Sequence, residues 1–215
     1  MNISFSEIRI TNMIKLYQKV TDKITLACSG GPDSMAALNF LDNGKREILV
    51  AHFDHKTDHS PCARNLVEKY CKLHDIPFVI GNITRERKKN ESPEEYWRNE
   101  RHKFFESLPG PVVTAHQLND VVEWWIFTSL NGNPQLMSYE NKEKNIIKPF
   151  ILTRKEDLMK WLRNKRVPYV LDPSNHDEKY MRGIIRNDVI PAALRVNPGL
   201  EKVIKKKLVK KNAQG

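Results

Sequence analysis

Apolar and polar residues alternate along this chain with two different periods. Four short apolar runs have the length and composition of buried strands: 24–28, 47–53, 76–81 and 112–115. Each is followed by a stretch with helical periodicity: 33–41, 61–74, 93–108 and 118–130. Strand and helix therefore alternate, which predicts an α/β fold with an open, mostly parallel sheet and helices on both faces.

Capping signals mark two helix starts. The stretch SPEE, 92–95, combines an N-cap serine, a proline at the first helical position and a glutamate at capping-box spacing. The stretch TRKE, 153–156, has the same spacing and predicts a second capping box, beyond a polar linker at 141–145. Periodic apolar positions in 1–20 predict an amphipathic helix ahead of the first strand.

The size and charge of the chain narrow its class. With 215 residues, 40% of them hydrophobic, the chain can bury one main core. Lys and Arg number 36 against 26 Asp and Glu, and the formal charge of +10 suits a polyanionic partner as well as plain solubility. A run of lysines between Lys202 and Lys211 predicts a frayed basic helix or tail, either a solvated terminus or a nucleic-acid contact.

The cysteine content indicates the cellular compartment of the protein. Cys28, Cys62 and Cys71 form no CxxC pair and leave one over from any disulfide. This usage predicts a cytoplasmic protein with neither a disulfide framework nor a zinc site. No apolar run approaches the length needed to cross a bilayer, so we expect no membrane partner.

The hexapeptide SGGPDS, 29–34, leaves the first predicted strand and enters the first predicted helix. Ligands of an open α/β sheet lie beyond the carboxyl ends of its strands, where helix N-termini collect, so this loop is a candidate phosphate site. Gly30 and Gly31 let the backbone approach a phosphate, while Ser29 and Ser34 can donate hydroxyl hydrogen bonds.

Pro32 and Asp33 complete the loop. Pro32 fits the first helical turn and offers no competing donor. A carboxylate beside a polyphosphate is repulsive unless a cation lies between them, so Asp33 argues for bound Mg²⁺. The alternative is an ordinary helix start, with glycine in the turn and serine or aspartate as the cap. The loop is not a Walker A motif, because no Gly-Lys-Ser/Thr closes it.

SGGPDS resembles the SGGxDS loop of the PP-loop pyrophosphatase superfamily, whose members cleave ATP between its α- and β-phosphates and adenylate a substrate. Four later segments resemble, in the same order, those of bacterial tRNA(Ile)-lysidine synthetases: VAHFDH (50–55), EEYWRNERHKFF (94–105), TAHQLNDVVEW (114–124) and DPSNHDEKYMRGIIR (172–186). The resemblance runs over about 24–198 and concerns the catalytic domain only.

The resemblance implies a ligase that uses ATP and Mg²⁺ and takes tRNA and L-lysine as substrates. ATP would adenylate the carbonyl oxygen of the wobble cytidine of an isoleucine tRNA, and the ε-amine of lysine would then displace AMP. Whether the protein forms a homodimer is left open by the resemblance. On this basis the chain divides into three parts: a PP-loop nucleotide-binding domain (1–135), the C-terminal part of the catalytic domain (136–200) and the basic tail (201–215).

Two carboxylates at the start of the fourth predicted helix could serve the second step. Asp120 and Glu123 share a helix face, so they can bind the lysine ammonium and one of them can accept its proton. Acidic residues are also favoured in any first helical turn, which is the structural alternative. His116, at the end of the fourth strand, can reach nucleotide or base, although a lone histidine is also commonly structural.

Four arginines are candidates for phosphate contacts or surface pairs. Arg98 matches a family arginine whose guanidinium could neutralise phosphates or charge on the adenylate. Arg101 is expected instead to pair with the glutamates at 94–95 on the surface. Arg182 and Arg186 lie one helical turn apart and can present a double positive edge to tRNA or phosphate; the alternative is a solvated basic face.

The end of the second strand is expected to hold the rest of the nucleotide. The family match indicates backbone at His52 and Phe53 beside the adenine, with Asp54 and His55 beside the ribose or phosphates. Residues 172, 174 and 175 are expected to be loop caps that position the helix carrying Arg182 and Arg186.

Several positions depart from the family pattern and keep alternatives open. One alternative is a PP-loop enzyme that modifies another base or uses another nucleophile, as in tRNA thiolation; the lack of a CxxC pair argues against sulfur chemistry. Another is a tRNA-binding module without catalysis, against which the retention of Asp33, Asp120 and Glu123 argues. The departures are Lys56 for Gly, Trp97 for Ala, Asn119 for Asp, Val121 for Gln, Trp124 for Thr and Gly183 for Asn.

Overall fold

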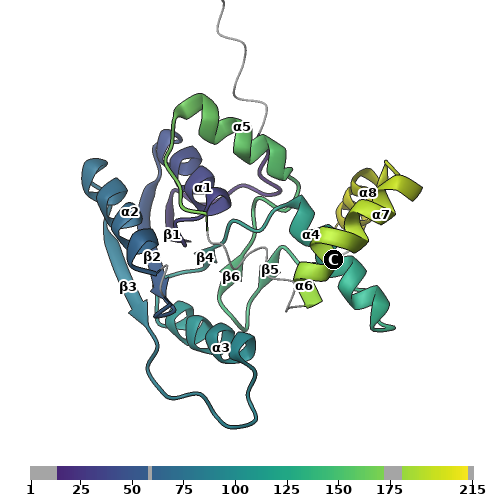
Figure 1. The fold of residues 1–215 in the computed structure, drawn as a ribbon. Helices are drawn as coiled ribbons and strands as arrows, with labels where there is room; N and C mark the ends of the chain where they lie inside the picture. The colour runs from purple at the N-terminus through teal and green to yellow at the C-terminus, as the bar shows by residue number, and fades with distance from the viewer. Residues whose placement is uncertain (1–13, 58–59, 172–180, 213–215) are drawn as a thin grey trace, which may run out of the picture.

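A six-stranded sheet with the strand order β3-β2-β1-β4-β6-β5 forms the centre of the protein (Figure 1). The structure is a computed structural model that describes residues 14–57, 60–171 and 181–212. Neighbouring strands pair in parallel except β5 and β6, which form an antiparallel hairpin at one edge. The expected open, mostly parallel sheet is confirmed. Its strands are β1 (Lys23–Ala27), β2 (Glu47–Asp54), β3 (Phe78–Asn82), β4 (Val112–Val113), β5 (Glu140–Asn141) and β6 (Ile146–Ile147).

The helices fall into two groups. Five follow or connect the strands: α1 (Pro32–Asn43), α2 (Ser60–Leu73), α3 (Pro93–Glu106), α4 (Leu118–Leu130) and α5 (Lys155–Lys165). The first four agree with the predicted helices to within two residues at each end. The second group ends the chain: α6 (Met181–Ile184), a π-helical turn η3 (Ile185–Val189), α7 (Ile190–Val196) and α8 (Leu200–Asn212).

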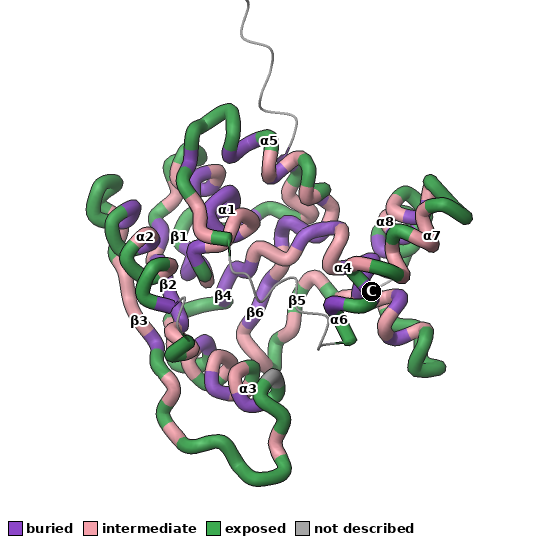
Figure 2. The backbone as a smooth tube through the Cα atoms, viewed as in Figure 1, coloured by how far each residue is buried: buried purple, intermediate pink, exposed green. Residues whose placement is uncertain are grey.

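Successive side chains of the short central strands enter two different cores, as the pleat of a strand requires. Val113 and Ile147 pack into the core shared with α1, α2 and α5, whereas Val112 and Ile146 pack against Phe105 of α3. Helices therefore cover both faces, with α1 and α5 on one side and α3 on the other (Figure 1). Buried residues concentrate in the central strands and in α1 (Figure 2).

The C-terminal helices pack on α4 and not on the sheet (Figure 1). Leu200, Ile204 and Leu208 of α8 are buried in one cluster with Val122 and Ile126 of α4. The basic segment, expected to be a frayed helix or a tail, is helical as far as Asn212. Its apolar residues recur every four positions and form a buried face, which the density of lysines conceals in the sequence.

The described part of the opening segment, 14–20, is not helical, whereas the rest of the predicted helix, 1–13, lies outside the described residues. Ile14 and Val20 are buried in the core beside α1, and the Tyr17 amide donates a hydrogen bond of 2.7 Å to the Pro149 carbonyl. The segment therefore runs across the molecule, with its apolar residues anchored separately.

One of the two capping signals is confirmed and the other is wrong. Ser92 caps α3, because its hydroxyl accepts a hydrogen bond of 3.2 Å from the Glu95 amide. Thr153 does not cap α5; its buried hydroxyl donates to the Lys15 carbonyl at 2.9 Å, and the N-cap position belongs to Arg154. Thr153 of the stretch TRKE thus makes a long-range contact and does not cap a helix.

Three further expectations can be compared with the structure. All three cysteines are free thiols. Within the described ranges, no helix is both long and apolar enough to cross a bilayer. The expected loop caps Asp172, Ser174 and Asn175 lie outside the described residues.

Candidate active site

The candidate residues gather at the carboxyl ends of β1 and β4, which are neighbours in the middle of the sheet. From β1 the chain moves through α1 to β2 on one side, and from β4 it moves to β6 on the other side. The two connections thus diverge at this point, and such a switch point is where ligands bind in open α/β sheets. Both α1 and α4 begin here, so the positive ends of two helix dipoles meet.

The loop between β1 and α1 has the backbone of a phosphate-binding turn. Gly30 has φ +81°, and a β-carbon there would come within 3.1–3.2 Å of Ala63 in α2. The Gly30 carbonyl accepts a hydrogen bond of 2.9 Å from the Val170 amide, which ties the loop to the segment after α5. Gly31 is the N-cap of α1 and supplies no side-chain cap, so the first-turn amides are free to bind an anion.

The hydroxyls and the histidine around the loop fix its shape. Ser34 is buried, and its hydroxyl donates to the Gly31 carbonyl at 3.0 Å and accepts from the Ser29 amide at 3.2 Å. Nδ1 of His52 lies 2.8 Å from the Cys28 carbonyl. Burial lowers the pKa of His52, so the ring is neutral at physiological pH and donates through Nδ1. These contacts hold the turn in a single conformation before any ligand arrives.

Gly30→Ala is expected to weaken both folding and nucleotide binding. The positive φ and the crowding by Ala63 together should cost about 1–3 kcal/mol of unfolding free energy. The matched control is Gly132→Ala, where φ is +78° but a β-carbon would meet nothing within 4 Å. Denaturant unfolding and titration with Mg·ATP measure the two effects. Equal stability losses in the two variants, with nucleotide affinity retained in both, would contradict the role given to Gly30.

Asp33 carries a buried carboxylate oxygen without a donor. Among the described residues, none forms a hydrogen bond with its Oδ1. Burial, followed by the charge of Asp120, raises the pKa of Asp33 to about 6, against the opposing charges of Lys155 and Arg186. An oxygen of this kind suits a cation, and Mg²⁺ commonly takes one or two carboxylates and completes its shell with phosphates and water. The donor set therefore fits Mg²⁺ bound together with a polyphosphate.

Asp120 faces the same crevice from the first turn of α4. Its Oδ2 accepts a hydrogen bond of 2.8 Å from the Gln117 amide, so this residue also caps its helix. Burial raises the pKa of Asp120 even though the Gln117 hydrogen bond and the charge of Arg186 oppose the shift. Asp33 and Asp120 thus form a pair of carboxylates that repel each other and attract a shared cation.

Lys155, which we did not single out from the sequence, also acts on this carboxylate pair. Its charge opposes the raised pKa of both Asp33 and Asp120. Its backbone amide donates a hydrogen bond of 3.2 Å to Oδ1 of Asn119 in α4. Lys155 lies in the stretch TRKE, whose spacing predicted a capping box and indicated no function for the lysine.

Glu123 is paired with both arginines of the C-terminal segment. Its Oε2 accepts hydrogen bonds from Arg186 at 2.7 and 3.1 Å, and its Oε1 lies 3.7 Å from Nε of Arg182. The Glu123 side chain is only 7% exposed. The structure therefore brings these three predicted site residues together, as an ion-pair network that joins α4 to α6 and η3.

A second group of charges surrounds His116 after β4. Nδ1 of His116 lies 2.8 Å from the Thr114 hydroxyl. Burial, followed by the charges of Lys148, Arg101 and Arg182, lowers the pKa of His116 to about 3. The ring is therefore neutral at physiological pH and sits among cations, which makes this part of the crevice attractive to an anion.

Arg101 belongs to this basic group, contrary to its expected place in a surface pair. Burial, together with the charges of Arg182 and Arg98, lowers its pKa. Arg98 itself is exposed, and its charge acts on Arg101 and His102. The structure thus sets Arg98 beside the basic group. The three-residue spacing of Arg98 and Arg101, which gives them one face of α3, is the sequence signal for Arg101.

At the end of β2, the predicted side chains have structural partners. Phe53 is buried and packs at 4.9 Å from the ring of His55. Burial opposes the shift, but hydrogen bonds from the Lys56 amide and from Ser60 lower the pKa of Asp54, and its Oδ1 accepts from Lys56 at 2.7 Å. Lys56 has φ +55°, which explains why glycine is usual in the family here. An adenine beside this strand stays a prediction.

Comparisons with known proteins add independent evidence. A family model described as PP-loop domain matches residues 4–193. The tRNA(Ile)-lysidine synthase of Thermotoga sp. (strain RQ2) is 28% identical over 198 residues, covering 85% of this chain and 48% of that protein. The tRNA(Ile)-lysidine synthase of Caldanaerobacter subterraneus subsp. tengcongensis is 31% identical over 201 residues, covering 85% and 43%.

A solved structure shares the fold. The U34-tRNA thiolase NcsA from Methanococcus maripaludis aligns with a TM-score of 0.69 at 14% identity, over 87% of this chain and 71% of that chain. The chain spans less than half the length of the two curated relatives named above. The similarity to them nevertheless extends over most of the present chain.

Proposed function

The chain belongs to the PP-loop domain family, and from this premise we propose that it catalyses ATP-dependent tRNA modification. The proposed reaction adenylates the wobble cytidine of an isoleucine tRNA, releases pyrophosphate, and then attaches L-lysine with release of AMP. Similarity to tRNA(Ile)-lysidine synthases over 85% of the chain supports this choice of substrate. We assign the reaction to the cytoplasm, where ATP and tRNA are available together.

One observation carries the proposal: two half-buried carboxylates, Asp33 and Asp120, lie at the start of α1, and Oδ1 of Asp33 is itself buried. A helix N-terminus with free amides binds phosphate, and a neighbouring carboxylate without a donor binds the accompanying cation. An ordinary helix N-terminus requires a capping residue, but it does not require a second carboxylate such as Asp120 opposite the helix start. The pair therefore supports Mg·ATP as the ligand.

In the first proposed step, the cytosine carbonyl oxygen attacks the α-phosphorus and the bond to pyrophosphate breaks. The Gly30 and Gly31 backbone and the start of α1 would hold the departing pyrophosphate. Asp33 would hold Mg²⁺, which supplies positive charge against the phosphates when bound. Arg101, with Arg98 beside it, would stabilise the negative charge of the adenylate.

In the second proposed step, lysine displaces AMP from the activated base. We assign Asp120 as the acceptor of the ε-ammonium proton, because burial raises its pKa while Glu123 is already bonded to Arg186. The free amine then attacks carbon 2 of the ring, and the bond from that carbon to the adenylate oxygen breaks. Neutral His116 can offer the base a hydrogen bond without adding charge.

Nucleoside mass spectrometry of tRNA tests the function directly. Purified protein is incubated with total tRNA, Mg·ATP and lysine, with ATP or lysine omitted in parallel. The expected result is a cytidine whose mass rises by one lysyl group and AMP released in equal amount, both dependent on lysine. An unchanged cytidine would refute the assignment. Modification with sulfide in place of lysine would indicate a different PP-loop reaction, and tRNA binding without ATP binding would indicate a non-catalytic module.

A further inference from the structure

We propose that the outward face of α8 is a docking surface for the phosphate backbone of RNA. The proposal rests on the proposed function and names the surface by which the tRNA is held. Helix α8 contains six lysines and one glutamate, so these 13 residues carry a formal charge of +5, half of the +10 of the whole chain. Such a concentration of one sign on one element is the electrostatic footprint of a polyanion partner.

The lysines of α8 are ordered along one face. Leu200, Ile204 and Leu208 turn toward α4 and are buried. On the opposite side Lys202, Lys206 and Lys210 recur every four residues, and all three are exposed. We call these three residues the α8 lysine stripe. At 1.5 Å of rise per residue, the stripe extends about 12 Å along the surface.

The α8 lysine stripe has no acidic partner among the described residues. Across the described part of the chain, no ion pair involves Lys202, Lys206 or Lys210. Glu201, the one acidic residue of the helix, is already bonded to Arg154 at 3.0 Å. A helix stabilised only by its own surface pairs would interleave acidic residues among these lysines. The stripe therefore keeps its full positive field for an external anion.

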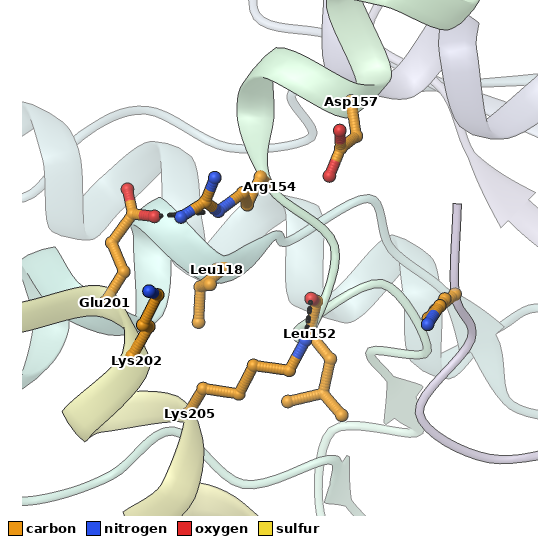
Figure 3. Close-up of a pocket in the computed structure, with 8 residues that line it drawn as sticks. Leu118, Leu152, Arg154, Asp157, Glu201, Lys202 and Lys205 are labelled. Atoms are coloured by element: carbon orange, nitrogen blue, oxygen red, sulfur yellow. Dashed lines mark hydrogen bonds and ion pairs between the residues drawn. The ribbon is translucent and has the colours of Figure 1, made fainter. Parts of the chain in front are cut away.

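The stripe leads into a groove where α8 meets the starts of α4 and α5. The groove has a volume of about 400 Å³. Figure 3 shows Arg154 reaching Glu201 on one side and Lys205 directed to the Leu152 carbonyl on the other. Its charged lining consists of four basic and two acidic side chains: Lys15, Arg154, Lys202, Lys205, Asp157 and Glu201.

The groove reaches the first turn of α4, the helix that also carries a residue of the candidate active site. Leu118, the first residue of α4, lines the groove, and Asp120 lies in the same first turn. A backbone that follows the stripe into the groove therefore arrives next to the helix that carries the proposed proton acceptor. An extended polyanion fits this path better than a single small anion, since the cations are strung out along it.

A lipid surface is the competing partner for a lysine-rich helix. Helices that bind membranes lay a free apolar face into the lipid while their lysines remain at the surface. The apolar face of α8 is already buried against α4, and its remaining valines, Val203 and Val209, are 40% and 44% exposed and lie apart on the helix. The observations therefore favour RNA.

Equilibrium binding of unmodified tRNA at several salt concentrations, without ATP or lysine, tests the proposal. The variant K202A/K206A/K210A should bind more weakly, and the slope of log affinity against log salt should fall by about 3, one for each lysine. The variant K202R/K206R/K210R should keep both affinity and slope. Alanine is the best helix former, so circular dichroism and thermal unfolding should show α8 intact.

The control removes two exposed lysines of α2, which lies on the other side of the molecule from α8 (Figure 1). K69A/K72A should leave tRNA affinity unchanged. Binding is measured here without the reaction. A wild-type protein that binds tRNA through the stripe but makes no lysidine would therefore contradict the proposed function and leave the docking surface standing. An unchanged salt slope in the alanine variant would overturn the stripe. Loss of binding to phosphatidylserine vesicles, with tRNA affinity retained, would overturn it in favour of a membrane.

Discussion

Asp33→Asn is expected to abolish tRNA modification and at the same time to stabilise the protein. Asparagine keeps the shape of the side chain but removes the charge that would hold Mg²⁺, so AMP release should fall by about a thousandfold or more. The ionised carboxylate is buried without a donor, and its neutralisation relieves that cost. Opposite changes in activity and stability are typical of a site built for function rather than for folding.

The stability gain should depend on pH in a defined way. The pKa of Asp33 is about 6 in the folded protein, above its usual 3.8, so the folded state holds this proton over a range where the unfolded state has lost it. The contribution of Asp33 to the stability of the wild type should therefore fall as pH rises from about 4 to about 6 and then level off. Asp33→Asn should match the wild type near pH 4 and exceed it by on the order of 2 kcal/mol at pH 7.

Denaturant unfolding at pH 4.0 to 7.5 (about half-unit steps suffice for one titration) measures this difference. The control is Asp188→Asn, which removes an exposed carboxylate of η3 and should change neither activity nor the pH profile. A loss of stability in Asp33→Asn at pH 7 would show that the carboxylate acts as a helix cap. Retained AMP release would remove the magnesium assignment.

Arg186→Ala is expected to destabilise the protein by about 2 kcal/mol. Truncation would leave Glu123 buried with its closest cation, Arg182, at 3.7 Å. Removal of one partner from a fully buried pair commonly costs about 3–5 kcal/mol, but Arg186 is 40% exposed, which reduces the expected loss. Modification should also fall, because the Glu123 network holds η3 against α4.

A double variant separates the ion pair from the lost side chain. Glu123→Gln combined with Arg186→Met removes both charges and keeps most of the volume, so it should recover much of the stability lost in Arg186→Ala. Arg195→Ala, at an exposed position of α7, is the matched control and should change stability by less than about 0.5 kcal/mol. An additive double variant would mean that the two residues act independently.

The sheet and its crossover helices were predictable because their signals are local. Apolar strands such as 47–53 and capped helix starts such as Ser92 are written in a few adjacent residues. The errors arose where distant partners decide the structure. The Lys15 carbonyl accepts a hydrogen bond from the Thr153 hydroxyl, and Leu208 is buried against residues of α4. Neither partner can be identified from neighbouring residues.

The candidate site was predictable as far as its residues follow the carboxyl ends of predicted strands. Asp33 and Asp120 each follow a predicted strand, the carboxyl ends of parallel strands meet at one edge of a sheet, and the structure brings the two charges together. The pairing of Glu123 with Arg186 was not predictable, because η3 packs on α4 only in the folded chain. The place of Arg101 in the basic group was not predictable for the same reason, since it depends on how α3 faces β4 and β6.

The pairing of β1 with β4 also sets the order in which the molecule acquires its parts. The Thr25 hydroxyl bonds to the Pro109 carbonyl, 84 residues farther along the chain. Strands β1 to β3 can assemble through shorter loops, whereas bringing β4 beside β1 requires closure of a long one, which is entropically slower. We therefore expect the two carboxylates of the crevice to meet only once β4 has paired with β1, so that nucleotide binding is among the last properties that the folding chain acquires.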